Sequence, residues 1–165
     1  MDRILVIGYG NPMRGDAGIG WRTAEGLQSF YAHNSRVAVI KCDQLTPEMA
    51  SDIAEANYVI FIDASERGVP GEIRDQAIDV GDPQNSFTHH LDPQTLLAMT
   101  CELFGRLPLA MIVTITGESF AHGREFSPAV QHALPLVQTH VRAMIDEQLA
   151  KLDLALTAHC GMAGT

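Results

Sequence analysis

Acidic and imidazole side chains follow several apolar runs of the chain, and these groups bind metal ions or transfer protons. Asp43 and Asp63 each lie at or just after a run typical of a buried strand, and His89 and His90 precede a helix-like segment. Carboxylates and imidazoles that converge on one rim form a metal site. The sequence therefore predicts a metal-facing rim. Two alternatives stay open: Asp63 as a cap of a helix or loop, and the two histidines as a polar turn.

A glycine-rich turn at residues 8–20 (GYGNPMRGDAGIG) stands where nucleotide-binding folds hold phosphate. The dinucleotide fingerprint, however, needs a third glycine where Met13 stands, and Asp43 is only a loose candidate for the ribose-binding acid. The turn also lacks the Gly-Lys-Ser/Thr run of a phosphate loop. We therefore predict no nucleotide cofactor.

The elements that position these residues alternate between apolar runs and amphipathic segments. Strands are predicted at residues 4–8, 36–42, 58–64, 71–80 and 109–117, and helices at residues 17–32, 45–56, 92–105 and 127–152. Only about seven residues separate the third strand from the fourth, too few for a parallel crossover, so the fourth strand is expected to be antiparallel. The predicted fold class is a three-layer α/β/α domain with a mixed five-stranded sheet, whose ligands lie beyond the carboxyl ends of the strands.

Local signals predict several helix boundaries. Three helices are expected to begin with a capping residue followed by proline, at Thr46–Pro47, Asp92–Pro93 and Ser127–Pro128. Pro135 lies inside the last predicted helix and is expected to kink or split it. Residues 153–165 are expected to form a weakly structured, flexible tail.

Composition limits the classes of protein that this chain can be. Its 165 residues, of which 46% are hydrophobic, predict one folded domain, residues 1–152. A formal net charge of -9 argues against nucleic acid or an anionic membrane as the main partner. The three cysteines are far apart in the sequence, which favours a reducing compartment over a disulfide framework. We predict a cytoplasmic protein, and a monomer.

The segments GYGNPMRGDAGIG, FIDA and THH, in this order and spacing, resemble the maturation endopeptidases of nickel–iron hydrogenases. The resemblance covers about residues 3–148 and extends to LTPEMA, PGEI, TGESF and SPAV, which resemble a cytoplasmic branch of that family. It implies a mixed five-stranded sheet with helices on both faces. It also implies an enzyme that removes a C-terminal extension from the hydrogenase large-subunit precursor, with nickel carried by that precursor as the recognition signal.

The resemblance further implies three side chains that face the metal: an acid in the first turn, an aspartate ending the third strand and a histidine before a later helix. The last two correspond to Asp63 and His89, and the spacing disfavours His90. At the first-turn position stands Ala17, whose methyl group cannot donate an electron pair. Asp16 is the neighbouring carboxylate that could replace the missing acid, although it is also placed to cap the following helix. The candidate catalytic and metal-facing residues are therefore Asp16, Asp63 and His89.

Three further positions are candidates for substrate contact: Asn11, Asp43 and Ala17 itself. The alternatives are a local turn hydrogen bond for Asn11 and a solvated loop acid for Asp43. Three interpretations of Ala17 stay open: a deliberate replacement that traps an inactive form, a natural loss that leaves a binder, or a site that works with two ligands and water. The competing functions are a non-catalytic binder of the precursor and a metal-dependent hydrolase with an unrelated substrate.

Overall fold

Five strands form one mixed sheet in the computed structural model, which describes residues 3–80 and 91–162. The strands are β1 (Ile4–Tyr9), β2 (Val37–Cys42), β3 (Tyr58–Ser65), β4 (Ile73–Ala77) and β5 (Leu109–Thr116). Their order across the sheet is β2-β1-β3-β5-β4, and only the β4–β5 pair is antiparallel. The predicted fold class and the antiparallel fourth strand are therefore confirmed, and the short β3–β4 connection is the physical reason.

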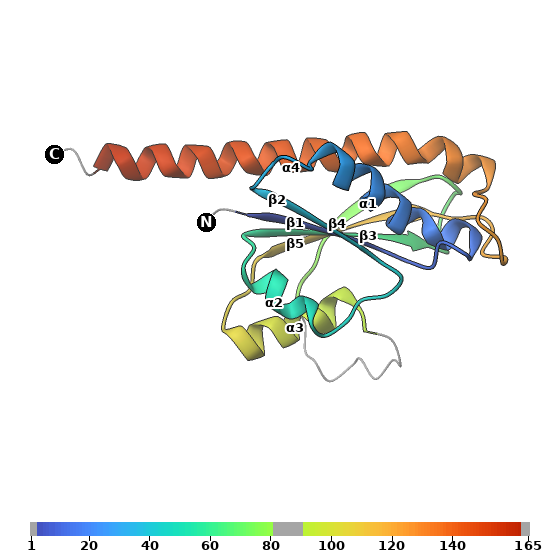
Figure 1. Ribbon diagram of the computed structural model, residues 1–165, viewed down its shortest axis with the longest axis horizontal. Coiled ribbons are helices and arrows are strands. Elements are labelled where there is room, and N and C mark those ends of the chain that lie inside the picture. The colour runs from blue at the N-terminus through green and yellow to red at the C-terminus, as the bar shows by residue number, and fades with distance from the viewer. Residues whose placement is uncertain (1–2, 81–90, 163–165) are drawn as a thin grey trace.

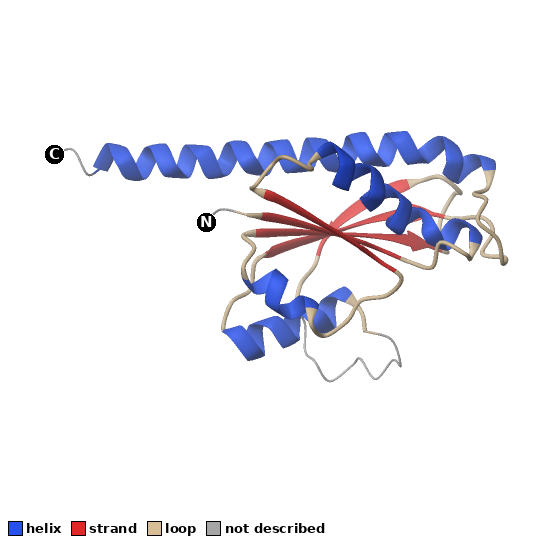
Figure 2. Ribbon diagram, in the orientation of Figure 1, coloured by secondary structure: helices blue, strands red, loops and turns tan. Residues whose placement is uncertain are grey.

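Helices cover both faces of this sheet (Figures 1 and 2). They are the short 3₁₀ helix η1 (Gly15–Gly18) and the α-helices α1 (Ile19–Phe30), α2 (Met49–Ala54), α3 (Pro93–Phe104) and α4 (Pro128–Met162). Helices α1 and α4 pack on one face, and α2 and α3 pack on the other (Figure 1). The sheet is thus the middle of three layers, as the alternation of strands and helices predicts.

Alternate residues of the central strands supply two separate cores. Ile4 and Val6 of β1 join the core beneath α1 and α4, whereas Leu5 and Ile7 join the core beneath α2 and α3. All four side chains are at most 2% exposed. A strand buried on both faces must be apolar at every position, which explains why β1 has a continuous apolar sequence.

The boundaries of α3 agree with its sequence signals, but those of α2 do not. The Asp92 carboxylate caps α3 by accepting from the Thr95 amide at 2.7 Å, and Gly105 ends it with a left-handed φ of 66°. Helix α2 begins only at Met49, after Glu48, so the prediction that Thr46 caps it is wrong. The residues between form turns before the regular helix starts.

Helix α4 is longer than its sequence signals predict. It runs to Met162, and Pro135 lies within it without splitting it. The expectation that the helix ends at residue 152 is therefore wrong, while the division into a domain and a tail stays a prediction. The last turns project beyond the body of the molecule (Figure 1), and Leu154 there is 70% exposed.

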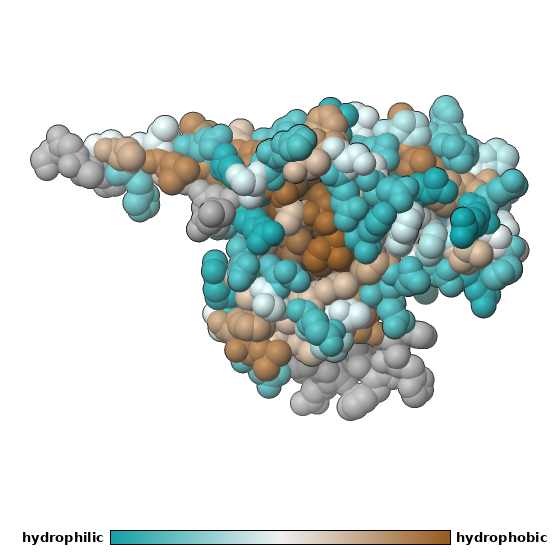
Figure 3. Space-filling view, in the orientation of Figure 1, coloured by the Kyte–Doolittle hydropathy of each residue, from teal (hydrophilic) through white to brown (hydrophobic). Residues whose placement is uncertain are grey.

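The surface that Figure 3 shows is mostly polar, with an apolar area between α1 and α2 around the edge strand β2. Ala38, Val39 and Ile40 of β2 are only half-buried, because an edge strand has a neighbour on one side only. No helix within residues 3–80 and 91–162 combines the length and the apolar character that crossing a membrane requires.

Candidate functional site

Polar side chains from neighbouring strands form a row near the carboxyl end of the parallel strands. Tyr9 pairs with Cys42 of β2, and Gly8 pairs with Ile62 of β3, so Tyr9 and Asp63 are the next neighbours across β1 and β3. Side chains alternate along a strand, and Tyr9 and Cys42 pack on the α2–α3 side. Asp63, two residues beyond Phe61 of the same core, projects to that side as well. The register thus brings a phenol and a carboxylate together at the edge where α/β folds bind ligands.

The Asp63 carboxylate is half-buried and accepts two hydrogen bonds from residues 3–80 and 91–162. Its Oδ1 accepts from the Ala64 amide at 2.7 Å, and the Tyr9 hydroxyl donates a second hydrogen bond. Burial raises the pKa of Asp63 to about 6, because these two hydrogen bonds only partly offset the loss of solvation. A carboxyl group with this pKa exchanges its proton near neutral pH. Strand β3 continues to Ser65, so Asp63 lies near, not at, its end.

Tyr9 is a site residue that sequence analysis missed, because a tyrosine at the end of a strand does not by itself indicate a functional site. Burial raises the pKa of its hydroxyl far above the ordinary value, and the charge of Asp63 and the hydrogen bond to it raise the pKa further. Tyr9 therefore remains a protonated donor toward Asp63. Its place at the carboxyl end of β1 could have marked Tyr9 as a site residue. Its contact with Asp63 could not be predicted, because that contact requires β1 and β3 to be neighbours in the sheet.

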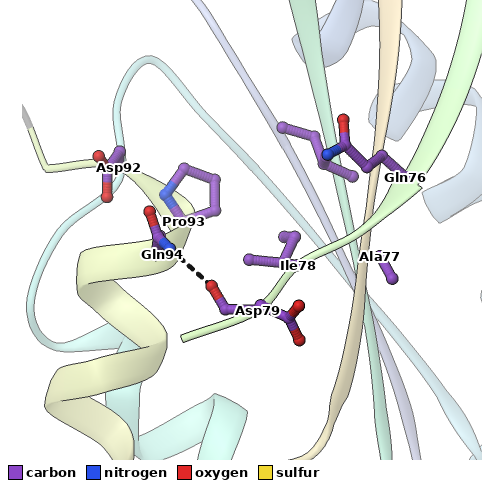
Figure 4. A pocket seen from close by; sticks show the side chains of 8 residues that line it. Gln76, Ala77, Ile78, Asp79, Asp92, Pro93 and Gln94 are labelled. Carbon is purple, nitrogen blue, oxygen red and sulfur yellow. Dashed lines mark hydrogen bonds between the residues drawn. The ribbon is translucent and has the colours of Figure 1, made fainter. Parts of the chain in front are cut away.

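A pocket of about 370 Å³ lies between the edge strand β4 and the start of α3 (Figure 4). Asp92 lines the pocket, and its charge also contributes to the raised pKa of Tyr9. Figure 4 shows Gln94 reaching the segment that follows β4, where its amide donates to the Asp79 carbonyl at 2.6 Å. The pocket wall is therefore fixed by contacts between α3 and the chain after β4.

Asp16 lies at the same end of the sheet but in a different environment. It is 0% exposed, and four hydrogen bonds converge on its carboxylate. Oδ2 accepts from the amides of Glu118 and Ser119 at 2.8 and 3.0 Å and from the Ser127 hydroxyl at 2.7 Å, and Oδ1 accepts from the Ser127 amide at 2.8 Å. The expectation that Asp16 caps the following helix is wrong, because its carboxylate holds both ends of the 117–127 loop instead.

These donors determine the charge of Asp16. Burial alone would raise the pKa of Asp16, but hydrogen bonds from Ser119, Glu118 and Ser127 hold it below the ordinary value. Asp16 is thus a fixed negative charge at neutral pH. Its contacts are those of a residue that ties η1 to the loop between β5 and α4.

The glycines of the first turn allow the backbone to approach β3 and α1 closely. A Cβ atom on Gly20 would collide with the carbonyl oxygens of Ile62 and Tyr9, and one on Gly8 would collide with the Gly20 carbonyl. Gly10 has a φ of 136°, and a Cβ there would collide with the Ala17 carbonyl. The start of α1 is therefore pressed against the ends of β1 and β3, and η1 with Ala17 is held beside the turn.

Comparison with known proteins finds proteins that are similar to this chain in sequence and in fold. No protein-family model matches the chain. Over 99 residues it is 30% identical to the hydrogenase 2 maturation protease of Escherichia coli K12, an alignment that spans 57% of each protein and so little more than half of that relative. The solved structure of the hydrogenase maturating endopeptidase HybD from E. coli matches with a TM-score of 0.71 and 25% identity over 88% of this chain and 93% of that one. The chain is therefore similar, in part of its sequence and in its fold, to hydrogenase maturation endopeptidases.

A solved structure of lower sequence identity has a similar fold. The [NiFe] hydrogenase maturation protease HycI from Thermococcus kodakarensis KOD1 matches with a TM-score of 0.72 and 21% identity, covering 87% of this chain and 92% of that one. At this identity the likeness concerns the fold alone. The overall fold is therefore a feature that this chain shares with the solved structures from E. coli and T. kodakarensis.

The other site residues predicted from the sequence lie outside the Tyr9–Asp63 row or outside the described residues. Asn11 is exposed, and its side-chain oxygen accepts from the Met13 amide at 2.9 Å, so the local turn hydrogen bond is confirmed. Asp43 is exposed directly after β2, where its charge, after burial, helps to raise the pKa of Cys42 to about 11. His89 and His90 lie outside the described residues. The predicted approach of Asp63 and His89 therefore stays a prediction.

The donor set limits what this site can hold by itself. Ala17 offers no donor where the resemblance to maturation endopeptidases implies an acid, and the Asp16 carboxylate is occupied by backbone and hydroxyl donors. Within residues 3–80 and 91–162, no three His, Cys, Asp or Glu side chains are grouped so that they could hold a metal ion. A closed metal site needs about four ligands, so the described residues do not fit a resident metal.

Proposed function

We propose that this chain is a maturation endopeptidase that removes the C-terminal extension of a nickel-loaded nickel–iron hydrogenase large-subunit precursor. One observation carries the proposal. In a fold shared with the maturation endopeptidases, a half-buried carboxylate, Asp63, lies near the carboxyl edge of the sheet with a pKa of about 6. Active sites shift carboxyl pKa values toward neutrality in this way. We place the reaction in the cytoplasm, with the chain acting as a monomer.

Asp63 has the central role in the proposed reaction. Its carboxylate faces the metal-bearing end of the precursor, and near neutral pH it can accept a proton from the attacking water and return it to the leaving amine. The Tyr9 hydroxyl fixes the orientation of the carboxylate by its hydrogen bond. His89, which lies outside the described residues, is the proposed second residue facing the metal.

Nickel belongs to the substrate in this proposal. When the precursor brings its metal to the rim, the metal supplies positive charge that favours an ionised Asp63. The chain itself contributes the half-desolvated carboxylate and the hydrogen bond that orients it. A site of this kind distinguishes a loaded precursor from an empty one, because only the former supplies the cation.

Ala17 is the feature that limits turnover in the proposed reaction. It removes one carboxylate from the metal-facing set. We propose that Asp16 does not replace it, since the Asp16 carboxylate already accepts four hydrogen bonds from the 117–127 loop. An Ala17→Asp variant restores the missing oxygen donor. We expect this variant to cleave the precursor faster than the unaltered chain.

The test is incubation of nickel-loaded precursor with the unaltered chain and with Ala17→Asp, followed by mass spectrometry of the precursor. Release of the C-terminal extension, faster with Ala17→Asp, is the expected result. A stable complex without cleavage by either protein would show a non-catalytic binder instead. Cleavage of generic peptides with added metal, and none of the precursor, would show an unrelated hydrolase. Precursor without nickel is the matched control and should remain uncut.

A further inference from the structure

Two adjoining pockets lie on the α1 side of the first turn and share the side chains of Arg22 and Arg124. The first, of about 320 Å³, is lined by these arginines with Pro12, Met13, Trp21 and Glu25. The second, of about 380 Å³, adds Glu125, Phe126, Gln131 and Leu134. We call the continuous surface of Met13, Trp21, Arg22, Arg124 and Phe126 the arginine groove.

The loop that carries Arg124 is fixed in place. The Gly123 amide donates to the Met13 carbonyl at 2.7 Å, and the Gly15 amide donates to the Gly123 carbonyl at 2.8 Å. The Arg124 Nε also contacts Met13 Sδ at 3.1 Å. Because Asp16 holds both ends of the same loop, Arg124 is presented at a defined position beside the first turn.

The charges of the groove leave its guanidinium groups available. Lys41 neutralises Glu25 through an ion pair of 3.0 Å and covers one face of Trp21 at 4.4 Å from the ring centre. Arg22 lies 5.7 Å from the ring centre of Phe126. Within the described part of the chain, neither Arg22 nor Arg124 forms an ion pair, although the protein has 20 acidic residues.

The groove therefore has a net positive charge on a chain whose overall charge is -9. Glu125 is the remaining acid in the second pocket, and one carboxylate does not neutralise two guanidinium groups. Guanidinium groups bind carboxylates with two parallel hydrogen bonds, and aromatic and thioether side chains accept aliphatic groups. A cationic area on an acidic surface also orients an acidic partner before contact.

We propose that the arginine groove binds an acidic segment of a peptide, with carboxylates on Arg22 and Arg124 and an adjacent aliphatic side chain against Trp21 and Met13. The inference rests on the proposed function, in which that segment belongs to the hydrogenase precursor. The groove lies on the α1 side of the first turn, whereas Tyr9 packs on the α2–α3 side of the sheet. A peptide held in the groove thus reaches Asp63 by crossing this turn.

The kinetic test compares two double variants with equal changes in net charge. Arg22→Glu/Arg124→Glu reverses both groove charges, and Arg106→Glu/Lys151→Glu reverses two exposed charges elsewhere. The groove variant should raise KM for the precursor by at least about tenfold with little change in kcat, since charge-assisted contacts are lost from binding only. The control variant should leave KM unchanged. An unchanged KM for the groove variant, or an equal rise for the control, would overturn the inference.

A binding test separates this inference from the proposed function. Fluorescence anisotropy would follow a labelled peptide of alternating Glu and Leu, and its Lys and Leu counterpart, added to the unaltered chain and to both double variants. The unaltered chain should bind the acidic peptide, more weakly as salt screens the charges, and the groove variant should lose this binding. If the precursor is not cleaved but these results hold, the endopeptidase proposal fails and the groove stands. Absence of binding to the acidic peptide overturns the groove regardless of cleavage.

Discussion

Two shielded aspartates at one end of the sheet have opposite protonation behaviour. Asp16 receives four hydrogen bonds from the described residues, which hold its pKa below the ordinary value despite burial, whereas Asp63 receives two from them and its pKa rises to about 6. The number of donors thus decides whether burial leaves a carboxyl group charged or ready to take up a proton. The fold uses the first kind to fix a loop, and the second is the kind that proton-transfer chemistry needs.

The largest expected effect separates the two residues by activity. Asp63→Asn should slow precursor cleavage by at least about 100-fold, because the amide cannot transfer the proton. The measurement is a time course of extension release by mass spectrometry. Asp52→Asn, an exposed carboxylate on α2, is the matched control and should cleave at the unaltered rate. Normal cleavage by Asp63→Asn would remove Asp63 from the reaction.

The next largest effect separates Asp16 from Asp63 by their contributions to stability. Asp16→Ala should lower the free energy of unfolding by on the order of 3 kcal/mol, because buried donors on the 117–127 loop lose a charged acceptor. The native pKa of Asp16 is lowered, so its contribution is fully present above the ordinary value of 3.8 and is lost as the pH falls through the native pKa. Urea unfolding at neutral and acidic pH measures both the loss of unfolding free energy and its dependence on pH. A loss as small as that of a surface substitution would contradict the structural role.

The contribution of Asp63 to stability is expected to depend on pH in the opposite direction. Unfolded chains ionise this group near 3.8, but the native protein keeps the proton until about pH 6, so native stability decreases as the pH rises between these values. Asp63→Asn removes this penalty while keeping an oxygen that accepts from Ala64. The variant should therefore be more stable at neutral pH by about 1 to 3 kcal/mol, measured by urea unfolding. A destabilised Asp63→Asn variant would show that the Asp63 carboxylate stabilises the fold, as the Asp16 carboxylate does.

The smallest effect concerns Tyr9. Its hydrogen bond lowers the pKa of Asp63, so Tyr9→Phe should raise that pKa further and shift the pH profile of cleavage upward. Tyr58→Phe is the matched control, since Tyr58 is 8% exposed and packs in the other core, beneath α1 and α4. The pH profile of kcat distinguishes the variants. An identical profile for both would show that Tyr9 does not act on Asp63.

Local chemistry made part of the structure predictable from sequence. The Asp92 cap and the terminal Gly105 of α3 concern residues within one helix, and the antiparallel β4 follows from a short connection. The partners of Asp16 lie 102 to 111 positions away, so no local pattern reveals them. A capping prediction failed there because the distant loop supplies better donors than the helix start.

The role of Tyr9 was hidden for a similar reason. Its contact with Asp63 depends on the order of strands in the sheet, which the sequence of β1 does not encode. The residues of the arginine groove likewise come from the first turn, from α1 and from a loop about 100 positions later in the chain. Asp63 could be singled out because an acid near the end of a buried strand is unusual in itself.

The most direct test is a carbon-detected NMR titration of the Asp16 and Asp63 carboxyl groups in the free protein. The account predicts a midpoint near pH 6 for Asp63 and a midpoint below 3.8 for Asp16. Equal midpoints near the ordinary value, or the reverse order, would contradict the distinction between a loop-fixing charge and a proton-transferring acid.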